Sequence, residues 1–244
     1  MFAFSVAGRA ITASFRVPET HTFHQTLPLP PRPTMIGMMG AALGLDLESA
    51  HKFAEKNEIL VSVWGDHRGS MRDLWNYRKV TIKEYDEEKI KSRSHYSILI
   101  REYLYDCDFR FFFGSPSLDA LEEVQQAMKS PVYALTAGNS DDLLKVTAVS
   151  EVREIETAPL KEFDHTILPG DVSTMCTPSV DFTKLPITVT VSSPQVFLLP
   201  TRFAFDGDQR AVLERQPFTF VRSPVNVSEP MEGYVIDNHA VILQ

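Results

Sequence analysis

The stretch HQTLPLPPRPTMIGMMGAALGL, residues 24–45, decides the fold of this chain. Its prolines hold the first half extended, because proline fixes φ and has no backbone N–H to donate. The second half is apolar all round, which predicts a buried helix that begins with Thr34 as its N-cap. Gly37, Gly40 and Gly44 fall on one stripe of that helix, where another backbone could approach closely.

Elements on both sides of this stretch complete the pattern of an α+β domain. Alternation over residues 2–17 predicts a strand with a bulge at Gly8. Downstream, periodicity and capping residues predict a helix at 46–56, a strand at 59–66, a strand at 96–104, a buried strand at 109–114, a helix at 117–130 and a strand at 132–142. This order predicts a ferredoxin-like (RRM-like) domain over residues 1–145, with an inserted β-thumb hairpin at about 66–98.

The remaining part of the chain, residues 146–244, shows no helical pattern. Proline-rich segments and Asp, Gly or Asn turns separate strand-like runs at 187–191, 195–199, 212–214, 218–222 and 234–242. A C-terminal antiparallel β region is therefore expected, either as a small sheet of its own or as an extension of the first sheet.

Charge is distributed unevenly along the chain, whose net charge is −8. Residues 1–104 hold 14 Lys and Arg against 12 Asp and Glu, whereas residues 105–244 hold 10 against 20. A polyanion would therefore meet the N-terminal part, and the C-terminal part suits protein neighbours better. The alternative is that the acidic surface merely keeps the protein soluble.

Several classes of protein are disfavoured by the sequence. The apolar opening is too short for a secretory signal, and no apolar stretch is long enough to cross a membrane. The two cysteines are far apart, so we expect a reduced, cytoplasmic protein without a membrane partner. His21 and His24 with Glu19 lack further ligands for a metal ion, and no cofactor motif occurs, so we expect neither metal nor cofactor.

Four phrases occur in an order that resembles the CRISPR-associated RAMP proteins of the Cas five family. They are FRVP (15–18), the stretch 24–45, YSILIREYLYDCDFRFFFGSP (96–116) and SPVYALTAGNSDDLLKV (130–146). The resemblance covers roughly residues 1–150, and it is greatest for type I-B members.

The resemblance implies both an architecture and a role. It implies an RRM-like domain with a β-thumb and a C-terminal β region. The implied role is a non-catalytic RNA-binding subunit of a type I CRISPR Cascade surveillance complex, in antiviral defence. Such a subunit caps the 5′ handle of the crRNA and one end of the backbone filament of RAMP subunits. It also bridges to the large subunit and, through the complex, meets target DNA.

Single-stranded RNA needs cations for its phosphates and flat side chains on which its bases stack. The predicted hairpin offers both, so our candidates there are Arg68, Arg72, Trp75, Tyr77, Arg78 and Lys79. Candidates on the first strand, the proline loop and the helix start are Phe15, Arg16, His24, Gln25, Arg32, Thr34 and Met35. The backbone N–H groups at the start of that helix could bind a phosphate.

Two other functions stay open at the level of sequence. In the type I-C branch the protein itself cuts precursor crRNA without metal, which requires a base, an acid and a cation. Tyr77, Lys91 and His95 supply those residue types around the hairpin. The other alternative is an α+β scaffold that binds only protein.

Overall fold

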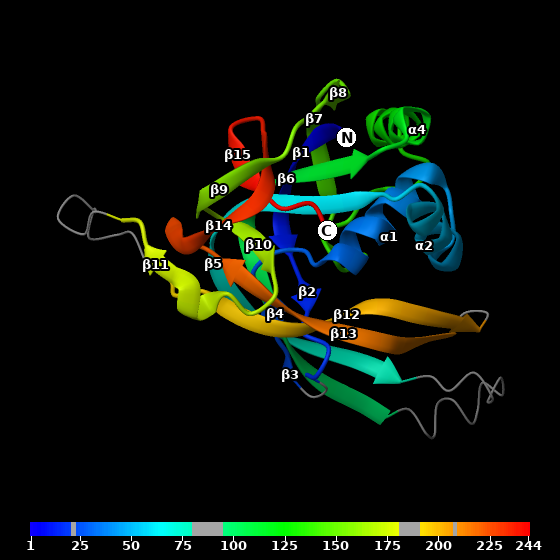
Figure 1. Cartoon of the computed structure of the whole chain (residues 1–244). Helices are drawn as coiled ribbons and strands as arrows, with labels where there is room; N and C mark the ends of the chain where they lie inside the picture. Colours follow the sequence, from blue (N-terminus) through cyan, green and yellow to red (C-terminus); the bar gives the residue numbers. More distant parts are fainter. Residues whose placement is uncertain (21–22, 80–94, 181–190, 207–208) are drawn as a thin grey trace.

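The computed structural model describes residues 1–20, 23–79, 95–180, 191–206 and 209–244 (Figure 1). For 77–79, 95–96 and 209 it describes the backbone. The helices are α1 (Arg32–Leu43), α2 (Leu47–Lys56), α4 (Leu118–Lys129) and the 3₁₀ helix η1 (Ser173–Met175). The strands are β1 (Phe2–Ala13), β2 (Phe15–Arg16), β3 (Phe23–His24), β4 (Thr26–Leu27), β5 (Leu60–Lys79), β6 (His95–Ser115), β7 (Leu144–Val149), β8 (Arg153–Glu154), β9 (Ala158–Phe163), β10 (Thr166–Pro169), β11 (Cys176–Pro178), β12 (Gln195–Asp206), β13 (Gln209–Val221), β14 (Val225–Ile236) and β15 (His239–Val241).

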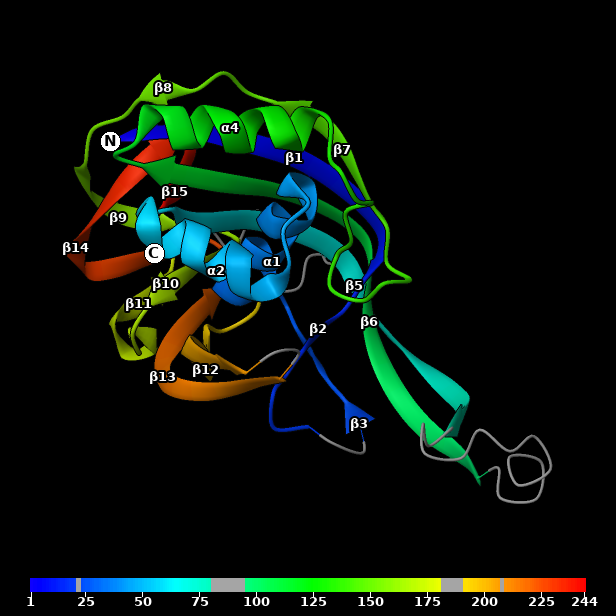
Figure 2. The same cartoon turned by 90° about the vertical axis from the view of Figure 1, so that its right-hand side faces the viewer.

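A mainly antiparallel sheet in the order β12-β13-β10-β5-β6-β1-β7 forms the centre of the described molecule. β1 pairs with β6 on one side and with β7 on the other, and the register shifts at Ala7 and Gly8, as the predicted bulge requires. β5 and β6 pair continuously from Leu60 and Gly114 to Lys79 and His95. Their outer halves project beyond the helices (Figure 2).

The apolar run in β6 shows how the sheet is buried on both faces. Phe111 and Phe113 belong to the core under the helices, where the rings of Phe113 and Phe4 stack with centroids 5.3 Å apart. Phe112 points the other way and packs against Val241 in β15. A strand that is covered on both sides has no reason to alternate apolar and polar residues. This explains the continuous apolar run in a central strand.

α1, α2 and α4 cover one face of the central sheet (Figure 2). α1 begins three residues earlier than predicted, and Pro31 rather than Thr34 is its N-cap. The carbonyl of Pro31 accepts hydrogen bonds from the N–H groups of Thr34 (2.9 Å) and Met35 (3.3 Å). Pro33 has no N–H to leave unpaired, so this start needs no side-chain cap.

The three glycines of α1 do not share one function, contrary to the prediction of a common close-packed stripe. A Cβ on Gly40 would lie 2.5 Å from the Cβ of Ala50, so Gly40 permits close packing of α2. Gly44 ends the helix in the left-handed region at φ 76°. A Cβ on Gly37 would meet nothing within 4 Å. Spacing alone could not separate these three environments.

The strand predicted at 132–142 is wrong. The chain forms a loop there, with a single bridge between Thr136 and Leu143, and the strand β7 begins only at Leu144. Gly138 adopts φ 105°, and the N–H of Ala137 bonds the carbonyl of Asp142 at 2.7 Å. A positive φ and a tight turn cannot continue an extended strand.

The C-terminal region takes both of the forms that the sequence left open. β10, β12 and β13 extend the central sheet beyond β5, whereas β9, β11, β14 and β15 form a second sheet. The runs predicted at 212–214 and 218–222 are one strand, β13, and most of 187–191 lies outside the described residues. Within the described part, no helix has both the length and the apolarity that a membrane crossing requires.

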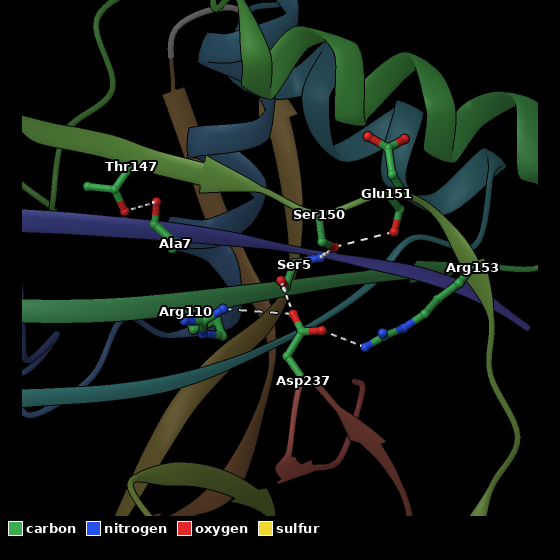
Figure 3. Close-up of polar contacts among 8 residues, drawn as sticks. All are labelled: Ser5, Ala7, Arg110, Thr147, Ser150, Glu151, Arg153 and Asp237. Carbon is green, nitrogen blue, oxygen red and sulfur yellow. Dashed lines mark hydrogen bonds and ion pairs between the residues drawn. The ribbon is translucent and has the colours of Figure 1, made fainter.

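Asp237, at the turn between β14 and β15, ties the second sheet to the first (Figure 3). Its carboxylate accepts a hydrogen bond from the hydroxyl of Ser5 in β1 and one from Arg153 of β8 at 2.6 Å. A guanidinium nitrogen of Arg110 in β6 lies 3.8 Å from the same carboxylate. Burial is the largest single influence on the pKa of Asp237, and it raises that pKa. The hydrogen bonds and the charges of Arg153 and Arg110 together outweigh burial, so the pKa of Asp237 lies below its usual value.

Candidate nucleic-acid interface

The segment of residues 25–34, which we call the proline segment, separates two hollows on the surface. The first, the cleft, has a volume of about 860 Å³. Its lining comprises Val17, Gln25, Thr26, Pro28, Asp66, His67, Arg68, Gly69, Ser70, Glu102, Leu104, His165, Ser192, Gln195, Phe197 and Arg222. The cleft therefore joins the root of the β5–β6 hairpin to β12 and to the end of β13.

The second hollow, the groove, lies on the other side of the proline segment. It consists of two adjoining spaces of about 400 and 230 Å³, which share Pro33, Thr34 and Arg210. The larger space is lined further by Arg16, Pro18, Leu27, Pro31, Leu199, Pro200, Phe203, Val212 and Arg215, and the smaller by Gly37, Met38, Ala41, Thr136 and Gly138. The groove thus follows the N-terminal half of α1.

Two side chains of the cleft, Arg68 and His165, face a carboxylate. Arg68 is ion-paired with Asp106, its Nε 2.6 Å from the carboxylate oxygen. His165 contacts the carboxylate of Asp164, and its Nε2 lies 3.6 Å from Asp66. Arg222 is the exception, because its guanidinium makes no hydrogen bond or ion pair with any residue that the structure describes. Burial lowers the pKa of Arg222, and the charge of Asp66 opposes that effect only in part.

His67 lies beside Arg222 in the cleft. Burial, and secondarily the charge of Arg222, lowers the pKa of His67 to about 4. The imidazole is therefore neutral at pH 7 and carries one donor and one acceptor. Neither ring nitrogen has a hydrogen-bond partner among the described residues. An unsatisfied polar group of this kind is costly in a finished interior and is common in a binding site.

The groove has a different electrostatic character. Arg16 donates to the carbonyl of Thr20 at 2.7 Å, which leaves its positive charge uncompensated. Arg215 is ion-paired with Glu19 at 2.9 Å. The guanidinium carbon of Arg210 lies over the ring of Phe203, 5.2 Å from the ring centroid, as in a cation–π contact. Among the residues that the structure describes, no Asp or Glu lines the groove.

The hairpin carries two further contacts between cations and aromatic rings. Arg72 lies over Phe23 at 5.1 Å, and Arg101 lies over Trp75 at 4.0 Å. Arg101 also donates to the hydroxyl of Tyr103 at 2.8 Å and is buried. One face of Trp75 is therefore covered by Arg101, although 39% of the residue is exposed. Arg101 therefore restricts the surface of Trp75 on which a base could stack.

Comparison with known proteins agrees with this architecture. The profile of the family described as CRISPR-associated protein (Cas_Cas5) matches residues 4–204. The chain belongs to the Cas5 family of CRISPR-associated proteins. No curated protein matches its sequence.

Solved structures show the fold of this Cas5 chain but are distant in sequence. A chain of a CRISPR RNA-guided surveillance complex is 16% identical, with a TM-score of 0.54, and the match covers 93% of this chain and 91% of that chain. A CRISPR protein from Archaeoglobus fulgidus is 11% identical, with a TM-score of 0.49 and coverage of 100% and 99%.

The structure distributes the predicted contact residues of this Cas5 protein over three places. Gln25 and Arg68 line the cleft, and Arg16 and Thr34 line the groove. The hairpin and its neighbour β3 carry the other residues with described side chains: Arg72, Trp75 and the half-buried His24. The side chains of Tyr77, Arg78, Lys79 and His95 lie outside the described part, as does all of Lys91. The backbone pairs Lys79 with His95, two positions beyond Tyr77.

Three predicted contacts need correction. Phe15 is only 3% exposed and packs edge-on against Phe109, and Met35 is fully buried, so both side chains belong to the core. Arg32 is half-buried, and its Nε donates to the main-chain oxygen of Gln244 at 3.3 Å. The helix start offers little to a phosphate, because the N–H groups of Thr34 and Met35 already bond Pro31.

Sequence reasoning missed the arginines that the C-terminal strands bring to the two hollows. Arg222 lines the cleft, and Arg210 and Arg215 line the groove. One signal was present, because four of the ten cations in residues 105–244 fall within 202–222. Among the described residues no three His, Cys, Asp or Glu side chains gather as a metal site would require, and His21 lies outside them.

Proposed function

We propose that this Cas5 protein is an RNA-binding subunit of a type I CRISPR surveillance complex, in antiviral defence. The observation that carries the proposal is the free guanidinium of Arg222 in a polar cleft at the root of a projecting hairpin. A half-buried cation without an ion pair to a described residue is unfavourable, and a phosphate can supply the missing charge. The surrounding polar side chains, among them Gln25 and Ser70, suit the sugar and base edges of a single strand.

The ligand that we infer is the 5′ handle of the crRNA. A short handle of fixed sequence needs a site for a few nucleotides rather than a long channel. The volume of the cleft, about 860 Å³, falls within the range of roughly 300–1,000 Å³ that is typical of sites for single small ligands. The projecting hairpin then lies beside the point where the strand leaves the cleft.

The strand order β5-β6-β1-β7, with crossovers through α1 and α4, supports a ferredoxin-like (RRM-like) unit. In this interpretation the outer parts of β5 and β6 form the β-thumb. Leu74, Ile98 and Ile100 are exposed on those strands, and Leu74 pairs directly with Ile100. We propose that this apolar patch contacts the neighbouring backbone RAMP subunit, so that the protein caps one end of the filament.

Apart from the arginines of residues 202–222 that line the two hollows, the acidic C-terminal part suits a protein rather than an RNA neighbour. Residues 105–244 hold 20 Asp and Glu against 10 Lys and Arg. We propose that this part of the chain contacts the large subunit. Target DNA would be contacted by the complex as a whole. Cytoplasmic location, expected from the sequence, belongs to the same proposal.

The function that we propose is binding without catalysis. The alternative catalytic set, Tyr77, Lys91 and His95, would place a metal-independent nuclease on the hairpin. The two functions differ in one assay, because a nuclease leaves two fragments of defined length and a binding subunit leaves the RNA intact.

The test uses the full chain and an end-labelled RNA with the repeat sequence of its own system, in EDTA. We expect a retarded complex, uncut RNA, and weaker binding of a DNA strand of the same sequence. Absence of binding at low salt, where phosphate contacts are strongest, would refute the proposal. Cleavage at one site that is lost in His95→Ala would replace it with the nuclease.

A further inference from the structure

The groove along α1 is continuous from the first strand to the loop before β7. Its two spaces meet at Pro33, Thr34 and Arg210, so a ligand that enters beside Arg16 can follow the helix as far as Gly138. The walls combine apolar and polar side chains, and they come mainly from the proline segment, from α1 and from β12–β13. An extended chain would fit such a shape better than a compact small molecule.

The charge of the groove selects the class of chain. Three arginines line it, and within the described ranges no acidic residue does, in a protein whose net charge is −8. Arg215 is balanced by Glu19, but Arg16 bonds only a carbonyl oxygen, and Arg210 has no hydrogen bond or ion pair to any described residue. Phe203 supports the guanidinium of Arg210 from one side. Two uncompensated charges therefore face the groove, and they suit a polyanion.

Gly37 supplies an independent observation. A glycine inside a helix destabilises it relative to alanine, and a helix retains one where packing or a ligand requires it. Gly40 packs against Ala50 and Gly44 ends the helix, but a Cβ on Gly37 would meet no protein atom within 4 Å. Gly37 lines the groove, so the space that it leaves open belongs to the groove.

We propose that the groove holds a segment of an RNA strand, with phosphates on Arg16 and Arg210 and with the strand passing close over Gly37. This rests on the proposed function in one respect, that the protein binds RNA. It adds a second path, which is separated from the cleft by the proline segment. A nucleic acid fits better than an acidic protein segment, because its phosphates recur along the whole length of the groove.

The experiment fills the open space without disturbing the fold. Gly37→Leu in the full chain places a side chain in the groove, and Gly37→Ala adds only a methyl group. Both substitutions favour the helix, so we expect an unchanged or higher melting temperature. We expect Gly37→Leu to weaken binding of labelled repeat RNA about tenfold or more, because a steric block removes contacts to the charged phosphates. Gln126→Leu, on the exposed side of α4, is the matched control and should bind like the wild type.

Arg210→Gln provides the second measurement. We expect about tenfold weaker binding, and a plot of log affinity against log salt that is shallower by about 0.7, the value for one phosphate contact of a single strand. If the wild type binds RNA and both Gly37→Leu and Arg210→Gln bind equally well, the groove is not its path, although the proposed function stands. If the wild type binds no RNA, both proposals fall. If a poly-glutamate probe displaces no RNA but binds in an Arg210-dependent way, the groove belongs to an acidic protein segment.

Discussion

The cleft and the groove lie on opposite sides of the same proline segment, and they differ in how their cations are balanced. In the cleft, Asp106 neutralises Arg68, whereas Arg222 makes no ion pair with a described residue. In the groove, Glu19 neutralises Arg215, and Arg16 and Arg210 keep their charge. The comparison teaches that the number of arginines in a hollow is a poor measure of its attraction for phosphate. The arginines without an ion pair determine how strongly a hollow attracts phosphate.

Charge reversal in the groove should have the largest effect. We expect Arg16→Glu combined with Arg210→Glu to weaken RNA binding about 100-fold or more near 0.1 M salt, because two attractive contacts become repulsive. Fluorescence anisotropy with labelled repeat RNA measures this. The control is Lys56→Glu combined with Lys161→Glu, which makes the same change in net charge at exposed positions outside both hollows. An equal loss in the control would show that net charge alone matters.

Removal of the free cation of the cleft should have the next largest effect. We expect Arg222→Gln to weaken binding about tenfold and to lower the salt dependence by about one phosphate contact, or about 0.7. Arg222→Lys should recover part of the affinity, because it keeps the charge but not the planar donor pair. Titration at several salt concentrations gives both quantities. If neither substitution of Arg222 changes the affinity, the cleft does not bind the RNA, and the groove is the remaining binding site.

The cleft should also respond to pH. The pKa of His67 is lowered to about 4, so its unfolded state takes up a proton at a higher pH than the folded state does. Stability that is present above pH 6.5 should therefore be lost as the pH falls toward about 4, with Arg222, Asp66 and His165 as charged or titratable neighbours. We expect a loss of about 1 kcal/mol between about pH 7 and about pH 5, reduced from the full value because the cleft is open to water.

Urea unfolding of the wild type and of His67→Gln at about pH 7 and about pH 5 measures this loss of unfolding free energy. His51 and His239 also have lowered pKa values, so the wild type loses further stability through them. The difference between the two proteins isolates His67. An identical pH dependence in His67→Gln would contradict the assignment.

The smallest effect is expected for Arg68. Because Asp106 already holds its guanidinium at 2.6 Å, Arg68→Gln should change RNA affinity by no more than about twofold. Asp106→Asn should instead strengthen binding slightly, since it releases the charge of Arg68 into the cleft. The same anisotropy titration distinguishes the two variants. A tenfold loss of RNA affinity in Arg68→Gln would refute the conclusion that ion-paired arginines contribute little to binding.

Elements with strong local signals could be predicted from the sequence. The helix α4 begins after Ser117, whose hydroxyl accepts a hydrogen bond from Ala120, and α2 begins after Asp46, which caps Ser49 in the same way. The start of α1 was misplaced, because two prolines replace the usual side-chain cap. Helical periodicity would place Leu118 on the buried face of α4, but it is exposed, since it lies at the first position, beyond the packed turns.

The candidate site could be predicted only on its N-terminal side. The predicted residues that line the two hollows come from the N-terminal part of the chain, in or near the proline segment and at the root of the hairpin. They are Arg16, Gln25, Thr34 and Arg68. Arg222 could not be placed, because it reaches the cleft only through pairing between β10 and β13. That pairing depends on strand partners far apart in sequence, on which local periodicity carries no information.

The contact between Ser5 and Asp237 has a consequence for how the chain reaches its native state. The two residues are 232 positions apart in the sequence. The backbone of β1 pairs with β6 and β7, which also follow much later in the chain. Proteins dominated by such distant contacts fold slowly, because loop closure precedes the contacts that reward it. During synthesis β1 is therefore an apolar strand without backbone partners until β6 and β7 have emerged. Ser5 meets Asp237 only when nearly the whole sequence has emerged. Such a chain depends on a chaperone, or on early capture by its complex, to escape aggregation.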